Sequence, residues 1–339
     1  TIEALSTALD EHYVEVSAIS AEGTKGLTIS RVDIHDLTHS PSGPNASTHG
    51  IRLSECEGVV LEEVVITEVI GAGVGLEVRT SAITTYGVRD LRLTQVTIDQ
   101  VTGAPDHSAA GVQLVGLDQA IGAYRLSEVS ISNVTGGALS APAAAPEAVS
   151  SWAAGVRIQT TSDEADPAII MDRLRVEGVR AHAIDGYGAP LSQGVHIDAA
   201  HPIAARHVIL SDIGLTGELT ALDLSAQAAG VDIRRAATLQ IEQVVFHGIG
   251  TGLTTNSGRA LMLRDWGVAQ DVRVQNSIVS HVRGVAFESA VTEVFDPAGI
   301  LVLNTLIGPD RPWHYATHSP ESAYADDVTF IGAQWWVDP

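Results

Sequence analysis

The stretch AAGVRIQT, residues 153–160, decides the fold because copies of it return along the chain. The copies share a small residue followed by alternating apolar and polar residues. The close ones are AAGVQLVG at 109–116, SQGVHIDA at 192–199 and AAGVDIRR at 228–235. The looser ones are THGIRLSE at 48–55, GVGLEVRT at 73–80, GRALMLRD at 258–265 and RGVAFESA at 283–290. Such self-similarity indicates a repeat architecture.

A second repeated unit lies between these copies. It consists of two short apolar runs joined by a polar step, as in LTISRVDIHDL at 27–37, VVLEEVVITEV at 59–69 and LRLTQVTIDQV at 91–101. Each run alternates with period two, which is typical of a strand with one buried face. The unit returns about every 30 residues, a period typical of solenoids. Three short strands per period predict a parallel β-helix.

We therefore predict an all-β, single-domain solenoid of about nine to ten coils. Residues 23–309 are expected to form the coils, with an N-terminal cap at 1–22 and a Trp-rich C-terminal cap at 310–339, because open strand edges must be covered. In the stretch 153–160, Val156 and Ile158 should face inward and Arg157 outward. Gly155 should supply a turn conformation that a side chain would obstruct.

Two stretches, VQNSIVSHV at 274–282 and LVLNTLIGP at 301–309, place Asn276 and Asn304 at the polar step. This pattern resembles the right-handed parallel β-helix superfamily, which includes pectate lyases, polygalacturonases, phage tailspikes and bacterial surface proteins. The resemblance covers residues 26–308 and implies a right-handed coil rather than an activity. The other coils have different residues at that step: Ser30, Glu62, Thr94, Ser127, Asp172, Ser211 and Glu242.

The net charge restricts the partners. The 339 residues carry 41 acidic and 19 basic side chains, a formal charge of −22, with one lysine at Lys25. Phosphate backbones and acidic lipids are not attracted to such a surface, so we expect no nucleic-acid partner and no membrane insertion. Cys56 is the single cysteine, which excludes an intrachain disulfide.

Outward positions of the repeated phrase predict one charged patch. In adjacent coils, Arg157, His196, Asp198, Asp232 and Arg234 should lie close together. Asp198 and Asp232 would serve as acid and base, His196 would tune them, and the arginines would hold an anionic sugar. The alternative is a ladder of opposite charges between neighbouring coils, which needs no substrate.

Histidines and one acidic loop are the candidate metal ligands in this sequence. His35, His39 and His49, like His196, His201 and His207, lack the dense spacing typical of zinc ligands, and solvated turn histidines explain them better. A second candidate is the loop TSDEADP at 161–167, where Asp163, Glu164 and Asp166 would bind Ca²⁺ weakly. No other cofactor is expected.

The resemblance to this superfamily does not include the catalytic motifs of its enzymes. The polygalacturonase-like Asn-Thr-Asp, Asp-Asp, Gly-His-Gly and Arg-x-Lys signatures are not found together in this sequence. We therefore expect a secreted or cell-surface module, bacterial and monomeric, that acts as a stalk, in adhesion or in binding a polysaccharide or a surface protein. The alternatives are a polysaccharide lyase or glycoside hydrolase acting on an acidic polysaccharide, and one part of a larger surface protein or fibre.

Overall fold

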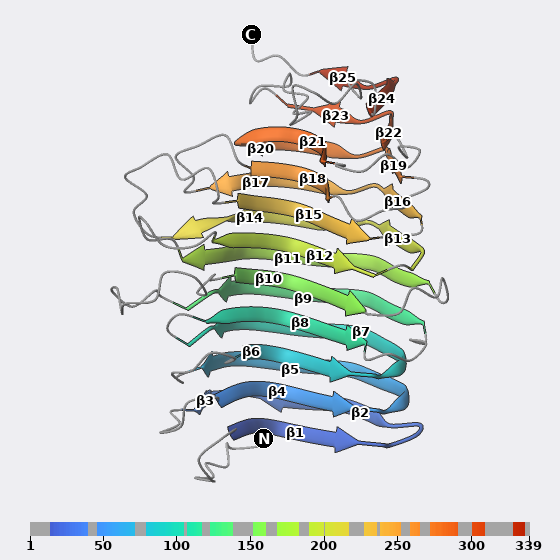
Figure 1. Ribbon diagram of the computed structural model, residues 1–339. Helices are drawn as coiled ribbons and strands as arrows, with labels where there is room; N and C mark the ends of the chain where they lie inside the picture. The colour runs from blue at the N-terminus through green and yellow to red at the C-terminus, as the bar shows by residue number, and fades with distance from the viewer. Residues whose placement is uncertain are drawn as a thin grey trace.

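A computed structural model gives the three-dimensional structure, and its pairing confirms the predicted fold class. The described residues are 14–39, 46–71, 79–104, 107–116, 123–137, 152–160, 168–182, 190–199, 201–216, 227–235, 238–251, 258–264, 272–290, 300–308 and 328–335. The regular elements in these ranges are all strands, and they stack in parallel into a β-solenoid (Figure 1). Within the same ranges, no helix has the length and apolar character that crossing a bilayer requires.

The repeated phrase builds a sheet of nine parallel strands, here called the first sheet, which faces the viewer in Figure 1. Its strands, in spatial order, are β1 (Val14–Glu22), β4 (Ala46–Ser54), β6 (Arg79–Tyr86), β8 (Ser108–Gly116), β10 (Trp152–Thr160), β12 (Leu191–Asp198), β15 (Gln227–Arg235), β18 (Gly258–Arg264) and β21 (Gly284–Ala290).

The paired apolar runs build the second sheet, of sixteen strands, on the other sides of the coil. In the earlier coils the two runs are mostly continuous, giving β2 (Thr28–Ile34), β3 (Leu37–His39), β5 (Glu57–Gly71), β7 (Arg89–Thr102), β9 (Tyr124–Thr135) and β11 (Ile169–His182). In the later coils they separate into β13 (Ile203–Arg206), β14 (Ile209–Thr216), β16 (Leu239–Glu242), β17 (Val245–Thr251), β19 (Val272–Gln275), β20 (Ile278–Val282), β22 (Ile300–Leu303), β23 (Leu306–Ile307), β24 (Val328–Ile331) and β25 (Gln334–Trp335).

In most coils of the second sheet, residues in the left-handed conformation occur at two places, and one of these is the bend at the polar step. The residues that share this place have φ between 44° and 56°: Arg31, Glu63, Gln95, Glu128, Arg173, His207, Gln243, Asn276 and Asn304. Asparagine tolerates this conformation better than most residues do. The predicted polar step was therefore placed one residue too early in the other coils. Ser211 was misaligned, because it pairs with Glu177 beyond the bend.

Gly155 does not have the expected role. Its φ is not positive; instead, a Cβ atom there would lie 2.3 Å from Val176 Cγ1, across the core. Gly194 is similar, since its Cβ would lie 2.6 Å from Ile213 Cδ1. These glycines let the two sheets approach closely, and Val156 and Ile158 face the core as predicted.

Both ends of the predicted coil region extend further than expected. Residues 14–22, predicted as part of the N-terminal cap, form β1 and pair with β4. At the other end, β24 and β25 pair with β22 and β23 inside the predicted C-terminal cap. The remaining cap residues, 1–13, 310–327 and 336–339, lie outside the described ranges, so the predicted caps stay predictions.

Candidate functional site

The outer face of the first sheet carries the predicted patch. Strand pairing aligns one outward column, which reads Arg52, Thr84, Gln113, Arg157, His196, Asp232 and Met262. Arg157, His196 and Asp232 therefore lie side by side on β10, β12 and β15. In β6 the residue of this column is Thr84, from the segment that follows the loose copy of the phrase at 73–80.

The predicted acid and base do not occupy equivalent positions. The register shifts between Ile197 and Asp198, so that Asp198 pairs with Arg235 while Asp232 pairs with His196. Arg234 is the extra residue of this bulge, and it is not opposite Asp198 as expected. Asp198 is half-buried, whereas Asp232 is fully buried. The two carboxylates therefore differ in position and in solvation.

His196 and Asp232 form a buried polar cluster with Gln193. The Nδ1 atom of His196 lies 3.2 Å from Asp232 Oδ2 and 2.9 Å from Gln193 Nε2. Gln193 Nε2 also donates a hydrogen bond to Asp232 Oδ2. His196 is 3% exposed and Asp232 0%. Gln193 was not predicted as a site residue, although the other close copies of the phrase have alanine at this outward position.

Burial keeps the His196 imidazole neutral. Desolvation lowers its pKa below 6.5, and Arg157 and Arg234 lower it further, although the hydrogen bond and the charge of Asp232 oppose this shift. Desolvation disfavours the charged form of an imidazole unless its partners compensate fully. His196 can therefore accept a proton only by forming an imidazolium cation, which its buried surroundings disfavour.

Two arginines of the patch lack hydrogen-bond partners at a buried atom. In the described part of the chain, the Nε atoms of Arg157 and Arg234 are both buried and unpaired. The Arg157 guanidinium stacks on the Trp152 ring, 3.9 Å from its centroid. Burial, together with the charges of Arg79 and Arg234, lowers the pKa of Arg157 to about 10, while the charge of Asp198 opposes this shift. Buried guanidinium N–H donors without an acceptor favour an anionic ligand.

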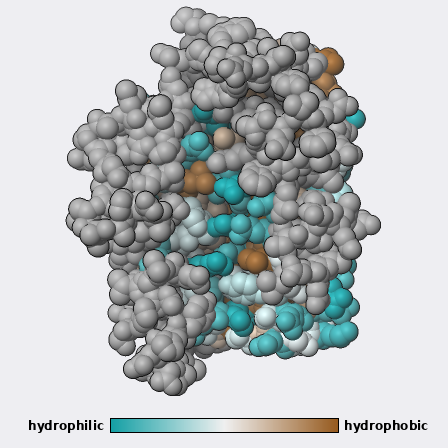
Figure 2. All heavy atoms as spheres, viewed as in Figure 1, coloured by the Kyte–Doolittle hydropathy of each residue, from teal (hydrophilic) through white to brown (hydrophobic). Residues whose placement is uncertain are grey.

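A second buried cluster lies nearer the N-terminus on the same face. His49 Nδ1 lies 2.7 Å from Ser81 Oγ, and His49 Nε2 lies 3.4 Å from Glu15 Oε1. Glu15 also pairs with Arg52. Desolvation and the charges of Arg52 and Arg79 lower the pKa of His49 to about 3. The outer face of the first sheet is thus polar over much of its length, and Figure 2 shows hydrophilic residues gathered along it.

The prediction of solvated turn histidines is wrong for His49, His196 and His201, which are buried. His35 is exposed on β2's side of the coil, where it contacts Asp33 and Thr67, whereas His49 is buried on β4. Over the ranges that the structure describes, no three His, Cys, Asp or Glu side chains are placed to hold a metal ion. Asp163, Glu164 and Asp166 lie outside those ranges, so the calcium prediction is untested.

Comparisons with known proteins add no identity to this geometry: no family model, curated protein or solved structure matches the chain. The parallel solenoid is established by strand pairing, and membership of the pectate-lyase-like superfamily stays a prediction.

Proposed function

We propose that this protein is a recognition module, secreted or displayed on a cell surface, that binds an acidic glycan on the outer face of the first sheet. One observation carries the proposal: Arg157 and Arg234 keep buried Nε donors that no described residue accepts from. A chain with a formal charge of −22 has many carboxylates with which to pair its arginines. Leaving these two buried Nε donors without an acceptor costs stability unless a ligand supplies one.

The negative charge of the whole chain limits the kinds of anionic ligand that can bind. A polyphosphate such as nucleic acid brings a high charge density that the acidic surface repels. An acidic polysaccharide presents fewer charges, together with hydroxyl groups that bind polar side chains. Trp152 lies beside Arg157 and adds an aromatic surface of the kind on which a sugar ring packs.

The test is equilibrium binding by calorimetry, with polygalacturonate as the acidic probe and an uncharged galactan as the neutral probe. We expect binding of the first only, and about tenfold weaker binding by Arg157→Gln, because one charge-assisted contact is lost. Arg173→Gln is the matched control, since Arg173 is on the second sheet and pairs with Glu128 at 2.7 Å. Equal binding of both glycans, or equal loss in both variants, would refute the proposal.

A second candidate function is cleavage of an acidic polysaccharide, and the contact between His196 and Asp232 favours it. A carboxylate beside an imidazole is a common acid–base arrangement. Recognition is preferred because both groups are almost completely buried. Cleavage is measured by the ultraviolet absorbance of unsaturated products and by new reducing ends. Activity that Asp232→Asn abolishes, with polygalacturonate binding retained, would replace the recognition proposal.

A further inference from the structure

His196 lies between the two arginines whose buried Nε donors have no described acceptor. Arg157 is on β10 and Arg234 on β15, and the strand between them is β12, which carries His196. His196 is in register with Arg157 on one side and with Asp232 on the other. An anion that accepts from both arginines therefore lies over β12, beside the His196 imidazole.

The carboxylate of Asp232 determines where the imidazole carries its proton. Asp232 Oδ2 accepts a hydrogen bond from Gln193 Nε2 and lies 3.2 Å from His196 Nδ1. An ionised carboxylate only accepts, so the neutral ring presents its Nδ1 proton to Asp232. Among the described residues, the hydrogen-bond contacts of His196 are made by Nδ1. The nitrogen that remains to accept a proton is Nε2.

The charged groups around the imidazole act in opposite directions. Desolvation lowers the pKa of His196 most, the hydrogen bond and the charge of Asp232 raise it, and the charges of Arg157 and Arg234 lower it. Asp198, on the same strand, has an interaction of its own and acts on the pKa of Arg157. The two arginines are thus the charged groups that oppose protonation of His196.

A bound anion would neutralise these two opposing charges. It would also place negative charge beside the imidazole, and an opposite charge at such a distance favours the charged form. The contribution of Asp232 would remain. Coupling between two ligands is reciprocal, so an anion that strengthens proton binding is itself bound more tightly when the proton is present.

We propose that recognition of an acidic glycan at this site is coupled to protonation of His196, so that an anion held by Arg157 and Arg234 is bound together with a proton. The proton comes from solvent and adds to Nε2, while the Nδ1 proton stays on the hydrogen bond to Asp232. This inference rests on the proposed function and deepens it by naming its regulation. The site should hold its glycan more tightly in mildly acidic surroundings than at neutral pH.

The experiment is calorimetry of octagalacturonate binding in two buffers of equal pH and different ionisation enthalpy. At pH 6 the observed enthalpy should differ between the buffers, which measures proton uptake, and the affinity should rise about tenfold from pH 7.5 to 5.5. Carboxylates of the probe stay ionised over this range. Arg157 stays charged over it too, because its pKa is about 10.

Variants assign the proton to a residue. His196→Gln should abolish the uptake, and Asp232→Asn should reduce it, because the imidazolium loses its counter-ion. His247→Gln is the matched control on the second sheet, where His247 Nδ1 lies 3.0 Å from Ser280 Oγ, and it should keep the uptake of wild type. Unfolding midpoints show whether each variant folds. In wild type, an NMR titration of the histidine rings should show a higher pKa for His196 in the saturated protein than in the free protein.

The outcomes separate the two proposals. If the oligomer binds without proton uptake and without a change in the His196 titration, proton coupling is refuted while acidic-glycan recognition stands. If the oligomer binds neither at pH 7.5 nor at pH 5.5, both proposals fall. Uptake that persists in a folded His196→Gln variant would overturn the inference and assign the proton to another group.

Discussion

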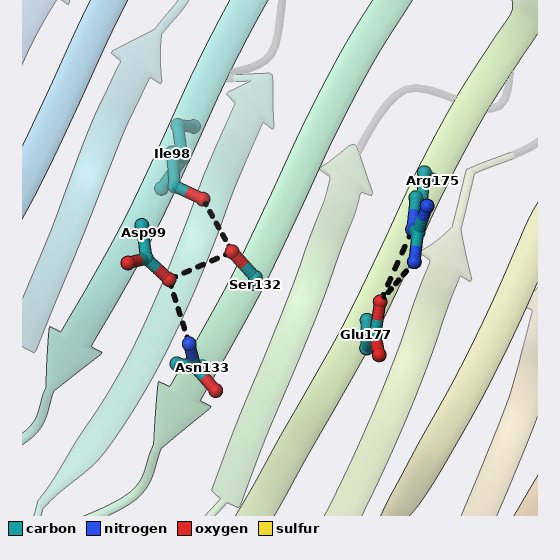
Figure 3. Close-up of polar contacts among 6 residues, drawn as sticks. All are labelled: Ile98, Asp99, Ser132, Asn133, Arg175 and Glu177. Carbon is teal, nitrogen blue, oxygen red and sulfur yellow. Dashed lines mark hydrogen bonds and ion pairs between the residues drawn. The ribbon is translucent and has the colours of Figure 1, made fainter.

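Several charged residues on the second sheet are exposed and paired, whereas one group on the first sheet is buried and only partly paired. On the second sheet, Arg31, Arg173 and Arg175 pair with Glu63, Glu128 and Glu177, and the arginine side chains are 58–82% exposed. Figure 3 shows the Arg175–Glu177 pair beside the Asp99–Ser132–Asn133 hydrogen bonds. On the first sheet, His196 and Asp232 are buried, and the buried Nε atoms of Arg157 and Arg234 have no described partner.

This difference distinguishes ordinary surface ion pairs on the second sheet from a candidate binding site on the first. Exposed ion pairs contribute little to stability, so the second sheet needs no explanation beyond solubility and strand pairing. Buried polar groups cost stability unless each is satisfied. A fold that only had to be stable would gain from apolar or paired side chains in their place. The first sheet is therefore where function is expected.

Acid should produce the largest effect, and it should act through the first sheet. His49 has an ordinary pKa near 6.5 when unfolded and about 3 when folded. As the pH falls through this window, the unfolded state binds a proton that the folded state refuses. Stability should then fall by up to about 1.4 kcal/mol per pH unit for this one group. Burial of His196 lowers its pKa too, and adds to the loss in the same direction.

Urea unfolding midpoints between pH 7.5 and 4.5 measure this effect. We expect His49→Asn to reduce the pH dependence, while His247→Asn, on the exposed face of the second sheet, should leave it almost unchanged. The same slope in wild type and His49→Asn would show that burial of His49 does not control acid stability.

A smaller loss is expected from Gly155→Ala, which tests the close packing between the sheets. The new Cβ would lie 2.3 Å from Val176 Cγ1 and 2.7 Å from the Gly194 oxygen. Overpacking of this kind costs about 1–3 kcal/mol. Val176→Ala added to Gly155→Ala should restore part of the stability, measured by chemical unfolding. If Gly155→Ala is as stable as wild type, the glycine is not required for close approach.

The smallest effect should come from the Arg175–Glu177 pair, whose closest atoms are 2.6 Å apart. A double-mutant cycle with Arg175→Ala and Glu177→Ala should give a coupling of about 0.2–1 kcal/mol, which decreases with salt, because both groups are well exposed. The corresponding cycle with His196→Ala and Asp232→Ala should give a larger coupling that resists salt. Equal couplings would remove the distinction between the two sheets.

The periodicities in the sequence were sufficient to predict the parallel solenoid and most of its alignment. The phrase from Ala153 identified Arg157, His196 and Asp232 as neighbours, because period-two alternation and the repeat interval determine which side chains share an outward column. The role of Gly155 was predicted wrongly, since sequence alone does not show which side chain lies across the core.

The register shift after Ile197 was decided only by the tertiary structure. A bulge leaves no trace in hydropathy, yet it moves Asp198 opposite Arg235 and away from the predicted pairing. The burial of His196 and Asp232 could not be predicted from the sequence either. Alternation shows that a side chain points outward, but it does not show whether that side chain is exposed to water. The sequence by itself thus determined the coil and the columns of outward residues. Only the tertiary structure decided which residues of a column are buried, which have hydrogen-bond partners and which have a donor free for a ligand. The reason is that solvation and hydrogen bonding depend on contacts between segments that are distant in the sequence.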